Sequence, residues 1–172
     1  MIIFAYITIF FFTLRFIISA VNILFSPVIK KQSFYSSPLV SVMIPARNEE
    51  DNIQRILNDL KNQDYNNIEV IVFNDESTDK TAELVSPFTE SDSRFKLINS
   101  DGLPKGWIGK NYACYSLSTK ASGEYFLFLD ADVRVGNDLI ESSLAQMNRH
   151  TLKLLSIFPN HEMNTLGEKF PV

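Results

Sequence analysis

The sequence predicts an α/β domain with a mainly parallel sheet flanked by helices, preceded by one amino-terminal transmembrane helix. From residue 39 onward, short β-rich runs alternate with helix-patterned segments, and a long apolar stretch comes before them. Alternating strands and helices are typical of βαβ units, whose strands run parallel. Three of the expected strands are followed at once by polar clusters, which favours a binding crevice at the carboxyl edge of the sheet.

The apolar stretch 2–25 is long enough to cross a hydrocarbon core about 30 Å thick at about 1.5 Å per residue. Lys30 and Lys31 follow it, whereas a cleaved signal peptide carries its charge in front of a shorter apolar core. We therefore expect a single-pass anchor in the cell membrane over residues 1–29. The positive-inside rule places the domain that follows in the cytoplasm.

Arg15, Ser19 and Asn22 would share one face of this helix, because they are spaced i, i+4 and i+7. A polar stripe within a membrane is typical of a face that contacts other membrane helices, which a partner would supply. The alternative is that Arg15 extends to the membrane surface without a partner.

Residues 30–38 are expected to form a polar linker, and residues 39–172 the domain itself. Residues 1–34 hold three basic and no acidic residues, whereas the rest holds 13 basic and 20 acidic residues. This acidic balance argues against a nucleic-acid partner, which would require a basic face. Cys114 is the only cysteine, so no internal disulfide can form, which fits a reducing compartment.

Local patterns place the elements of the domain. A β-rich run at 39–44 stops at Pro45, and Asn48 is expected to cap the helix that follows. That helix has one apolar face, with the i, i+3, i+4, i+7 spacing at Ile53, Ile56, Leu57 and Leu60. Similar patterns predict further strands at 68–73, 95–98, 125–129 and 152–158, and helices at 81–88, 110–120 and 137–149.

The run 126–129 leads straight into Asp130 and Asp132. An unbroken apolar run is typical of a strand that is covered on both faces. Residues i and i+2 of a strand lie on the same side, so both carboxylates would project together at its carboxyl end. Paired carboxylates repel each other unless a cation lies between them. The pair therefore favours a divalent-metal site that could hold a diphosphate.

This aspartate pair has two other interpretations, of which the first stays open and the second is excluded by the residue types. A solvated turn after a core strand would look the same. A calcium loop of the EF-hand type would place Glu141 at its twelfth position, but Arg134 stands at a ligand position and Val135 where the turn glycine belongs.

Polar clusters at 45–50, 74–79 and 130–132 follow three predicted strands. In a doubly wound sheet such strand ends meet at one crevice. Helix capping is the alternative explanation for Ser77 and Asp79, but capping does not account for all three clusters together.

At these residues the chain resembles the family 2 glycosyltransferases of the GT-A fold. The resemblance covers about residues 39–160 and rests on the stretches 40–50, 72–81 and 128–133. The stretch 106–115 is similar to a narrower branch, the carotenoid (diaponeurosporenoate) and hopanoid-associated glycosyltransferases of bacteria.

The resemblance implies an inverting, metal-dependent enzyme that transfers a sugar from a nucleotide-sugar, with a UDP-sugar expected. The membrane anchor favours a lipid-like or membrane-associated acceptor, such as a membrane lipid or an isoprenoid, although an anchor would also suit a polysaccharide synthase. Mg²⁺ or Mn²⁺ would bridge the diphosphate. The residues implied for the nucleotide pocket are Pro45, Arg47 and Glu49. The resemblance further implies that Asp75 hydrogen-bonds the base of the nucleotide and that Asp130 contacts the ribose or the sugar. It implies that Asp132 ligates the metal.

Two residues of the glycine-bearing loop remain open between a functional and an ordinary role. Lys110, which follows Gly109, is expected to contact the diphosphate or the donor sugar, with an exposed surface lysine as the alternative. It does not belong to a P-loop, because Pro104 stands where the first glycine is required. Trp107 is either a platform for a sugar or acceptor or an aromatic that packs the loop.

The sequence departs from the family in its carboxyl-terminal part. Neither a recognisable general base nor carboxyl-terminal membrane helices follow Pro159, and Glu162 and Glu168 lie in no familiar context. Asn74 and Glu76 stand where the family more often has aspartate and glycine. We expect a truncated chain that binds nucleotide-sugar but transfers poorly alone, since inversion needs a general base.

Two other functions are compatible with parts of the pattern. A nucleotidyltransferase usually carries a glycine-rich, basic loop after its first strand, where this chain has the acidic stretch 46–50 without glycine. A truncated, non-catalytic protein that binds nucleotide-sugar or a membrane partner is the alternative to an enzyme.

Overall fold

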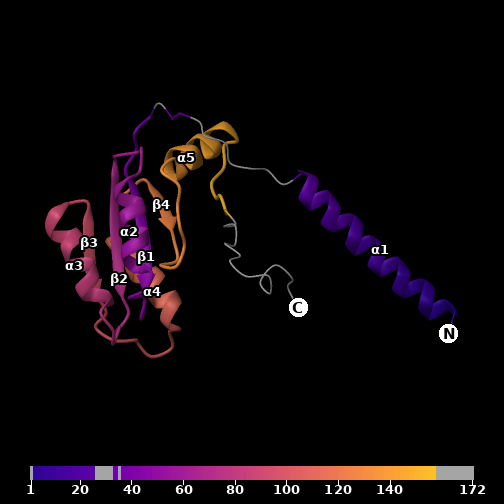
Figure 1. Ribbon diagram of the computed structural model, residues 1–172, viewed down its shortest axis with the longest axis horizontal. Helices are drawn as coiled ribbons and strands as arrows, with labels where there is room; N and C mark the ends of the chain where they lie inside the picture. Colours follow the sequence, from indigo (N-terminus) through magenta and orange to yellow (C-terminus); the bar gives the residue numbers. More distant parts are fainter. Residues whose placement is uncertain (1, 26–32, 35, 158–172) are drawn as a thin grey trace. The chain divides into compact units, whose positions relative to one another are not determined.

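The computed structural model describes residues 2–25, 33–34 and 36–157 (Figure 1). The chain divides into two compact units, residues 1–30 and 31–172. Four residues that entered the sequence predictions lie outside the described ranges: Lys30, Lys31, Glu162 and Glu168.

The first unit contains helix α1, Ile2–Phe25. Its stretch Ile2–Asn22 is long and apolar enough to cross a membrane, by length and composition. The large apolar side chains that the structure describes on this helix are exposed, which is expected of a surface that meets lipid rather than water. The apolar helix predicted from the sequence is therefore present as a candidate membrane span.

The second unit is built on a four-stranded sheet with the order β3-β2-β1-β4. All three strand pairings are parallel, so the prediction of a mainly parallel α/β fold is confirmed. β1 lies inside the sheet, between β2 and β4. The strands are β1 (Val40–Ala46), β2 (Ile68–Asn74), β3 (Phe95–Asn99) and β4 (Tyr125–Phe128).

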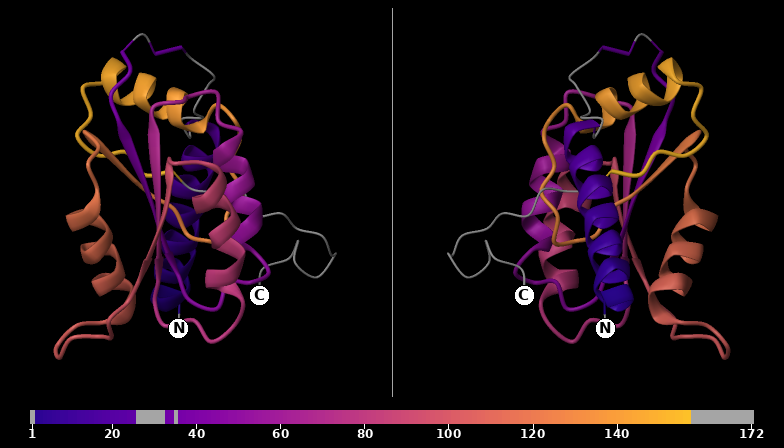
Figure 2. Two further views of the ribbon diagram at one scale, coloured as in Figure 1. Left: turned by 90° about the vertical axis from the view of Figure 1, so that its left-hand side faces the viewer. Right: turned by 90° about the vertical axis from the view of Figure 1, so that its right-hand side faces the viewer.

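Helices cover both faces of this sheet, as Figure 2 shows. The helices α2 (Ile53–Lys61) and α3 (Thr81–Ser91) pack on one face, and α4 (Gly109–Lys120) packs on the other. The last helix is α5 (Leu139–Arg149), which joins the core on the α2 side through Ile140 and Leu144.

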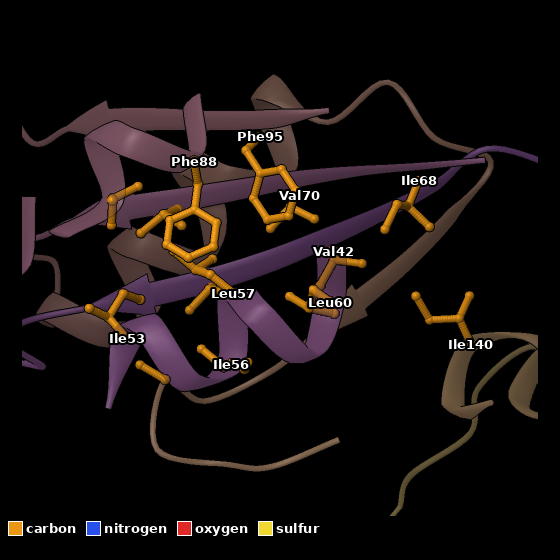
Figure 3. Packing of buried hydrophobic residues seen from close by; sticks show 14 of the residues in the cluster. Val42, Ile53, Ile56, Leu57, Leu60, Ile68, Val70, Phe88, Phe95 and Ile140 are labelled. Carbon is orange, nitrogen blue, oxygen red and sulfur yellow. The ribbon is translucent and has the colours of Figure 1, made fainter. Parts of the chain in front are cut away.

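The alternation of strand side chains explains why both faces are buried. In β1, Val42 and Ile44 face α2, whereas Met43 faces α4, and β2 alternates in the same way. The apolar face of α2 that the sequence predicted, from Ile53 to Leu60, is fully buried against the sheet (Figure 3). The strands of a sheet covered on both sides are mostly apolar, and the polar residues Ser41 of β1 and Glu69 of β2 are themselves buried.

Three predictions about local structure were wrong. Asn48 does not cap α2, because Asn52 immediately precedes that helix and Asn48 adopts a left-handed turn with φ of 56°. No strand forms within 152–157, the described part of the strand expected at 152–158. β4 is not covered on both faces, because the side chains of Phe126 and Phe128 are 50% and 47% exposed. α4 covers β1 and β2 but does not extend over β4.

A buried polar network joins the strands on the α4 face of the sheet. Glu69 on β2 accepts hydrogen bonds from Ser41 Oγ (2.6 Å), the Ser122 backbone N–H (2.6 Å) and Lys96 Nζ (2.8 Å). The Gly123 N–H donates to Ser41 Oγ, and a Cβ at Gly123 would lie 2.6 Å from the Ser41 nitrogen, so this approach requires glycine. The network fixes the loop before β4 against β1 and β2.

The charge of Glu69 is maintained by this network. Burial opposes the charged form and by itself would raise the pKa of Glu69, but the hydrogen bonds from Lys96, Ser41 and Ser122 outweigh it and lower the pKa. A carboxylate with a lowered pKa in the folded state contributes stability above its unfolded pKa and loses it as the pH falls through the folded pKa.

We predict that Glu69→Gln lowers the free energy of unfolding by about 1–3 kcal/mol at neutral pH, because the amide nitrogen cannot accept from Lys96. The difference from the unsubstituted chain should shrink as the pH falls below the pKa of glutamate in the unfolded chain and through the lower pKa of Glu69 in the folded state. Urea unfolding of the full chain in detergent, followed across a pH series, measures both effects. Glu90→Gln, at an exposed position of α3, is the control. A loss equal to that of the control, or one that does not change with pH, would contradict the role of the network.

Candidate functional site

Polar residues from three strand ends line one cleft, open to solvent, at the carboxyl edge of the sheet. Its volume is about 340 Å³, within the range typical of small-molecule sites. The cleft lies where the chain order reverses, since β2 and β4 flank β1 on opposite sides. All seven residues predicted for the site line this cleft: Pro45, Arg47, Glu49, Asp75, Lys110, Asp130 and Asp132.

The two aspartates after β4 reach the cleft from a turn. β4 ends at Phe128, and residues 131–132 form a turn, so the alternation of a strand does not bring the carboxylates together. The Val133 N–H donates to the Asp130 carbonyl at 3.4 Å, which closes this turn. Both side chains line the cleft and are exposed to solvent, while Ala131 between them is buried.

Asp75 provides a buried carboxylate in the cleft. It follows β2, and its N–H donates to the Ala46 carbonyl at 2.9 Å, which holds it against the end of β1. The Arg47 guanidinium lies 3.5 Å from Asp75 Oδ2 and is itself mostly exposed. A Cβ at Gly109 would lie 3.3 Å from the same oxygen, so the start of α4 packs closely beside this carboxylate.

Lys110 crosses the cleft from the first turn of α4. Its Nζ donates to Asp130 Oδ1 at 2.7 Å, and this hydrogen bond raises the pKa of Lys110, which keeps the amine charged. Both side chains are more than half exposed, so the pair contributes little to stability. The lysine can exchange this partner for a ligand anion, and the amino terminus of α4 beside it also favours negative charge.

The charges of the cleft favour a cation together with an anionic ligand. Four carboxylates line it against only two cationic side chains, those of Arg47 and Lys110. Within the described ranges, no group of three or more His, Cys, Asp or Glu side chains is placed to hold a metal ion. Mg²⁺ and Mn²⁺ need only one or two protein carboxylates when phosphate oxygens and water supply the other ligands. Asp132, which the ion pair leaves out, and Asp130 fit that requirement.

Hydrogen bonds between the loops after β1 and β2 hold the wall of the cleft. The Asn48 N–H donates to Ser77 Oγ at 3.0 Å, and the Thr78 N–H donates back to Asn48 Oδ1 at 2.9 Å. Asp79 accepts from the Glu50 N–H at 3.1 Å and from the Thr81 N–H at 3.0 Å. Lys80 precedes α3 without a side-chain capping hydrogen bond, so Ser77 and Asp79 serve mainly to join the two loops rather than to cap this helix.

The two departures from the family pattern occupy defined places at the end of β2 and in the loop that follows it. Asn74 donates to Asn99 Oδ1 at 2.9 Å, which an aspartate carboxylate could not do, and accepts from the Ser77 N–H. Glu76 has a φ of 54°, in the left-handed region that glycine adopts most easily. A glycine would relieve strain at position 76.

Sequence reasoning missed the small residues that shape the cleft. Ala46, Gly109, Ala113 and Ala131 line it beside the charged groups. Their small side chains leave room for a ligand. The one sequence feature that could have identified them is their position, either next to a predicted polar residue or one helical turn away from it. Trp107 is not among the residues that line the cleft; its ring contacts Tyr112 and Tyr115 instead.

Comparison with known sequences gives a consistent result. The sequence profile of the family described as "Glycosyl transferase family 2" matches residues 41–165. The chain is 35% identical over 137 residues to a 4,4'-diaponeurosporenoate glycosyltransferase of Staphylococcus haemolyticus, with 77% of this chain and 35% of that protein covered. The chain thus spans about a third of the length of this relative.

Solved structures share the fold of the second unit. Residues 1–349 of S. aureus TarS in complex with UDP are 29% identical to the chain, with a TM-score of 0.56, over 65% of this chain and 32% of that one. A mannosyltransferase of Pyrobaculum calidifontis, in complex with GDP-Man and Mn²⁺, matches at 24% identity and a TM-score of 0.62 over 78% of this chain and 39% of that one. The second likeness concerns the fold alone.

We predict that Asp79→Ala loosens the two joined loops. The hydrogen bonds of Thr81 and Glu50 to the carboxylate outweigh the opposing effect of burial and lower the pKa of Asp79, which is therefore charged at neutral pH. Its loss should speed amide hydrogen exchange at Glu50 and Thr81 about tenfold or more. Exchange measured in Asp51→Ala, an exposed neighbour in the same loop, is the control. Unchanged protection of both amides would show that the loops are held by other contacts.

Proposed function

Because this chain belongs to glycosyltransferase family 2, we propose that it forms the nucleotide-sugar-binding part of a membrane-anchored, inverting glycosyltransferase. The donor is a UDP-sugar and the acceptor is lipid-like or membrane-associated. The convergence of the seven predicted site residues, six of them polar, from separate parts of the chain in one cleft carries this proposal. The S. aureus TarS structure in complex with UDP, a neighbour in fold at 29% identity, supports the uridine nucleotide.

Each group in the cleft has a role in this proposal. The buried carboxylate of Asp75 accepts hydrogen bonds from the base, while Pro45, Arg47 and Glu49 line the nucleotide pocket. Lys110 leaves Asp130 to contact the diphosphate, and Asp130 then contacts the ribose or sugar. The exchange is inexpensive, because the Lys110–Asp130 pair is exposed and its hydrogen bond is replaced by one to the ligand.

Asp132 holds Mg²⁺ or Mn²⁺, together with the diphosphate. The excess of carboxylates in the cleft supports this assignment, since a diphosphate alone would add negative charge to a negative site. When bound, the metal neutralises the charge that builds on the leaving nucleoside diphosphate. The metal and the nucleotide are therefore expected to bind cooperatively rather than independently.

Transfer requires more than the donor groups. The acceptor hydroxyl attacks the anomeric carbon, the bond from that carbon to the diphosphate oxygen breaks, and the hydroxyl proton passes to a general base. None of the described residues is assigned as this base. The residues of the cleft bind and orient the donor, which leaves one face of the sugar for the attack.

The membrane has two functions in the proposal. Residues 1–29 anchor the chain and residues 30–38 link them to the domain of residues 39–172, on the cytoplasmic side of the cell membrane. Other membrane helices are partners for the face that carries Arg15. A relative named for diaponeurosporenoate supports an isoprenoid-like acceptor within the same membrane. The alternative is a non-catalytic protein that binds nucleotide-sugar or a membrane partner.

We predict that the full chain in detergent binds UDP in a Mn²⁺-dependent way and that Asp132→Asn weakens this binding about tenfold or more, because it removes the metal carboxylate. Isothermal titration calorimetry with and without Mn²⁺ measures the effect. Asp101→Asn, an exposed aspartate that does not line the cleft, is the control. Equal binding with and without Mn²⁺ would contradict the metal assignment, and no binding by a folded chain would contradict the donor site.

We also predict that Lys110→Gln weakens UDP binding about tenfold, because a charged hydrogen bond to the diphosphate is lost. The affinity of the variant should depend less on salt than that of the unsubstituted chain. Lys120→Gln, at the exposed carboxyl end of the same helix, is the matched control. An affinity that equals the control would make Lys110 an ordinary surface lysine.

A further inference from the structure

Exposed apolar side chains gather on the loop between β3 and α4 and on the adjacent turns of α4. We call Leu103, Trp107, Ile108 and Tyr115 the aromatic tip. Ile108 is 72% exposed and Trp107, the only tryptophan of the chain, is 40% exposed. Figure 2 shows that this loop projects away from the sheet at the amino-terminal end of α4. Large apolar side chains gathered at one exposed place are typical of a contact surface.

The aromatic tip is held in place by rings that reach the core. The Trp107 ring centroid lies 5.0 Å from that of Tyr115 and 5.6 Å from that of Tyr112. Tyr112 in turn makes an edge contact with the buried Phe73 of β2, at 6.2 Å. The turn itself uses Gly106 with a φ of 89°, which other residues rarely adopt. The exposed rings are therefore fixed before any partner binds.

The charge around the aromatic tip is opposite to that of the rest of the unit. Residues 102–115, which hold the tip, contain two lysines, Lys105 and Lys110, and no acidic residue, whereas residues 35–172 as a whole hold 13 basic and 20 acidic residues. Lys105 lies within the loop and is exposed. Lysine beside exposed tryptophan and aliphatic side chains suits the headgroup region of an anionic bilayer, where the rings lie among the headgroups and the amines meet phosphate.

We propose that the aromatic tip inserts into the interfacial layer of a lipid bilayer, as a second membrane contact independent of α1. The charge complementarity supports a bilayer as the partner, and so does the membrane-length helix in the same chain, which would keep a bilayer at high effective concentration. Gly109 and Lys110 follow the tip directly and line the cleft. Insertion therefore brings the mouth of the cleft to the lipid surface. This consequence rests on the proposed function, but the insertion itself does not.

The single tryptophan allows a direct test, because α1 contains none and all tryptophan emission comes from the tip. The full chain is reconstituted in vesicles of phosphatidylcholine and phosphatidylglycerol whose acyl chains carry bromine at a shallow position. Insertion should shift the Trp107 emission to shorter wavelength, quench it by the brominated lipid and protect it from aqueous acrylamide. Ile108→Ser and Lys105→Glu should each reduce the lipid quenching about twofold or more.

Matched controls separate the tip from other exposed residues. Leu154→Ser removes a more exposed aliphatic side chain elsewhere, and Lys61→Glu reverses a charge at the end of α2, on the other face of the sheet. Both should leave quenching unchanged. Emission that is open to acrylamide and unaffected by bromine would overturn the proposal. Protection from both quenchers would overturn it too, since it would mean that protein covers the tip.

Calorimetry with UDP in the same vesicles distinguishes the two proposals. A tip that fails to insert while UDP binds would overturn the membrane contact and leave the donor site standing. Insertion of the tip without UDP binding would leave the membrane contact standing and overturn the donor site.

Discussion

The parallel pairing of β1 with strands on both of its sides is the constraint on which the site depends. β2 lies on one side and β4 on the other, so the loops that leave their carboxyl ends flank the loop after β1 and form a crevice at the carboxyl edge of the sheet. Arg47, Asp75 and Asp132 come from three such loops and meet only because the three strands point the same way. No local interaction between these loops would bring them together without the sheet.

Structural and ligand-binding tasks are divided among similar polar residues around the cleft. Asn48, Ser77 and Asp79 satisfy backbone groups of the neighbouring loop, so their hydrogen-bonding capacity is largely used. Lys110 and Asp132 line the cleft and are exposed to solvent. A rigid wall beside adaptable charges is an arrangement that orients a ligand without a large conformational change.

The fold and the site residues were predictable to different degrees, for physical reasons. The buried face of α2 could be predicted from the spacing of its apolar residues. The mostly apolar runs of β1 and β2 could be recognised because these strands are buried on both faces. The alternation that was expected to pair Asp130 with Asp132 does not operate, since a turn places them. The pairing of Lys110 with Asp130 and the network around Glu69 depend on residues far apart in sequence, which no local pattern contains. The uncovered face of β4 could not be predicted, because an apolar run reads the same whether or not a helix lies above it.

The distance along the chain between the two sides of the sheet also sets an order of assembly. Ser41 of β1 is joined to Gly123, 82 residues later, and β4 follows directly. During synthesis, β1 and β2 can pair before β4 leaves the ribosome, and contacts between residues far apart in sequence form slowly. The growing chain therefore passes through a stage in which one edge of β1 is open. The cleft is among the last parts of the domain to form, so under the proposed function a nucleotide can assist only the final step of folding.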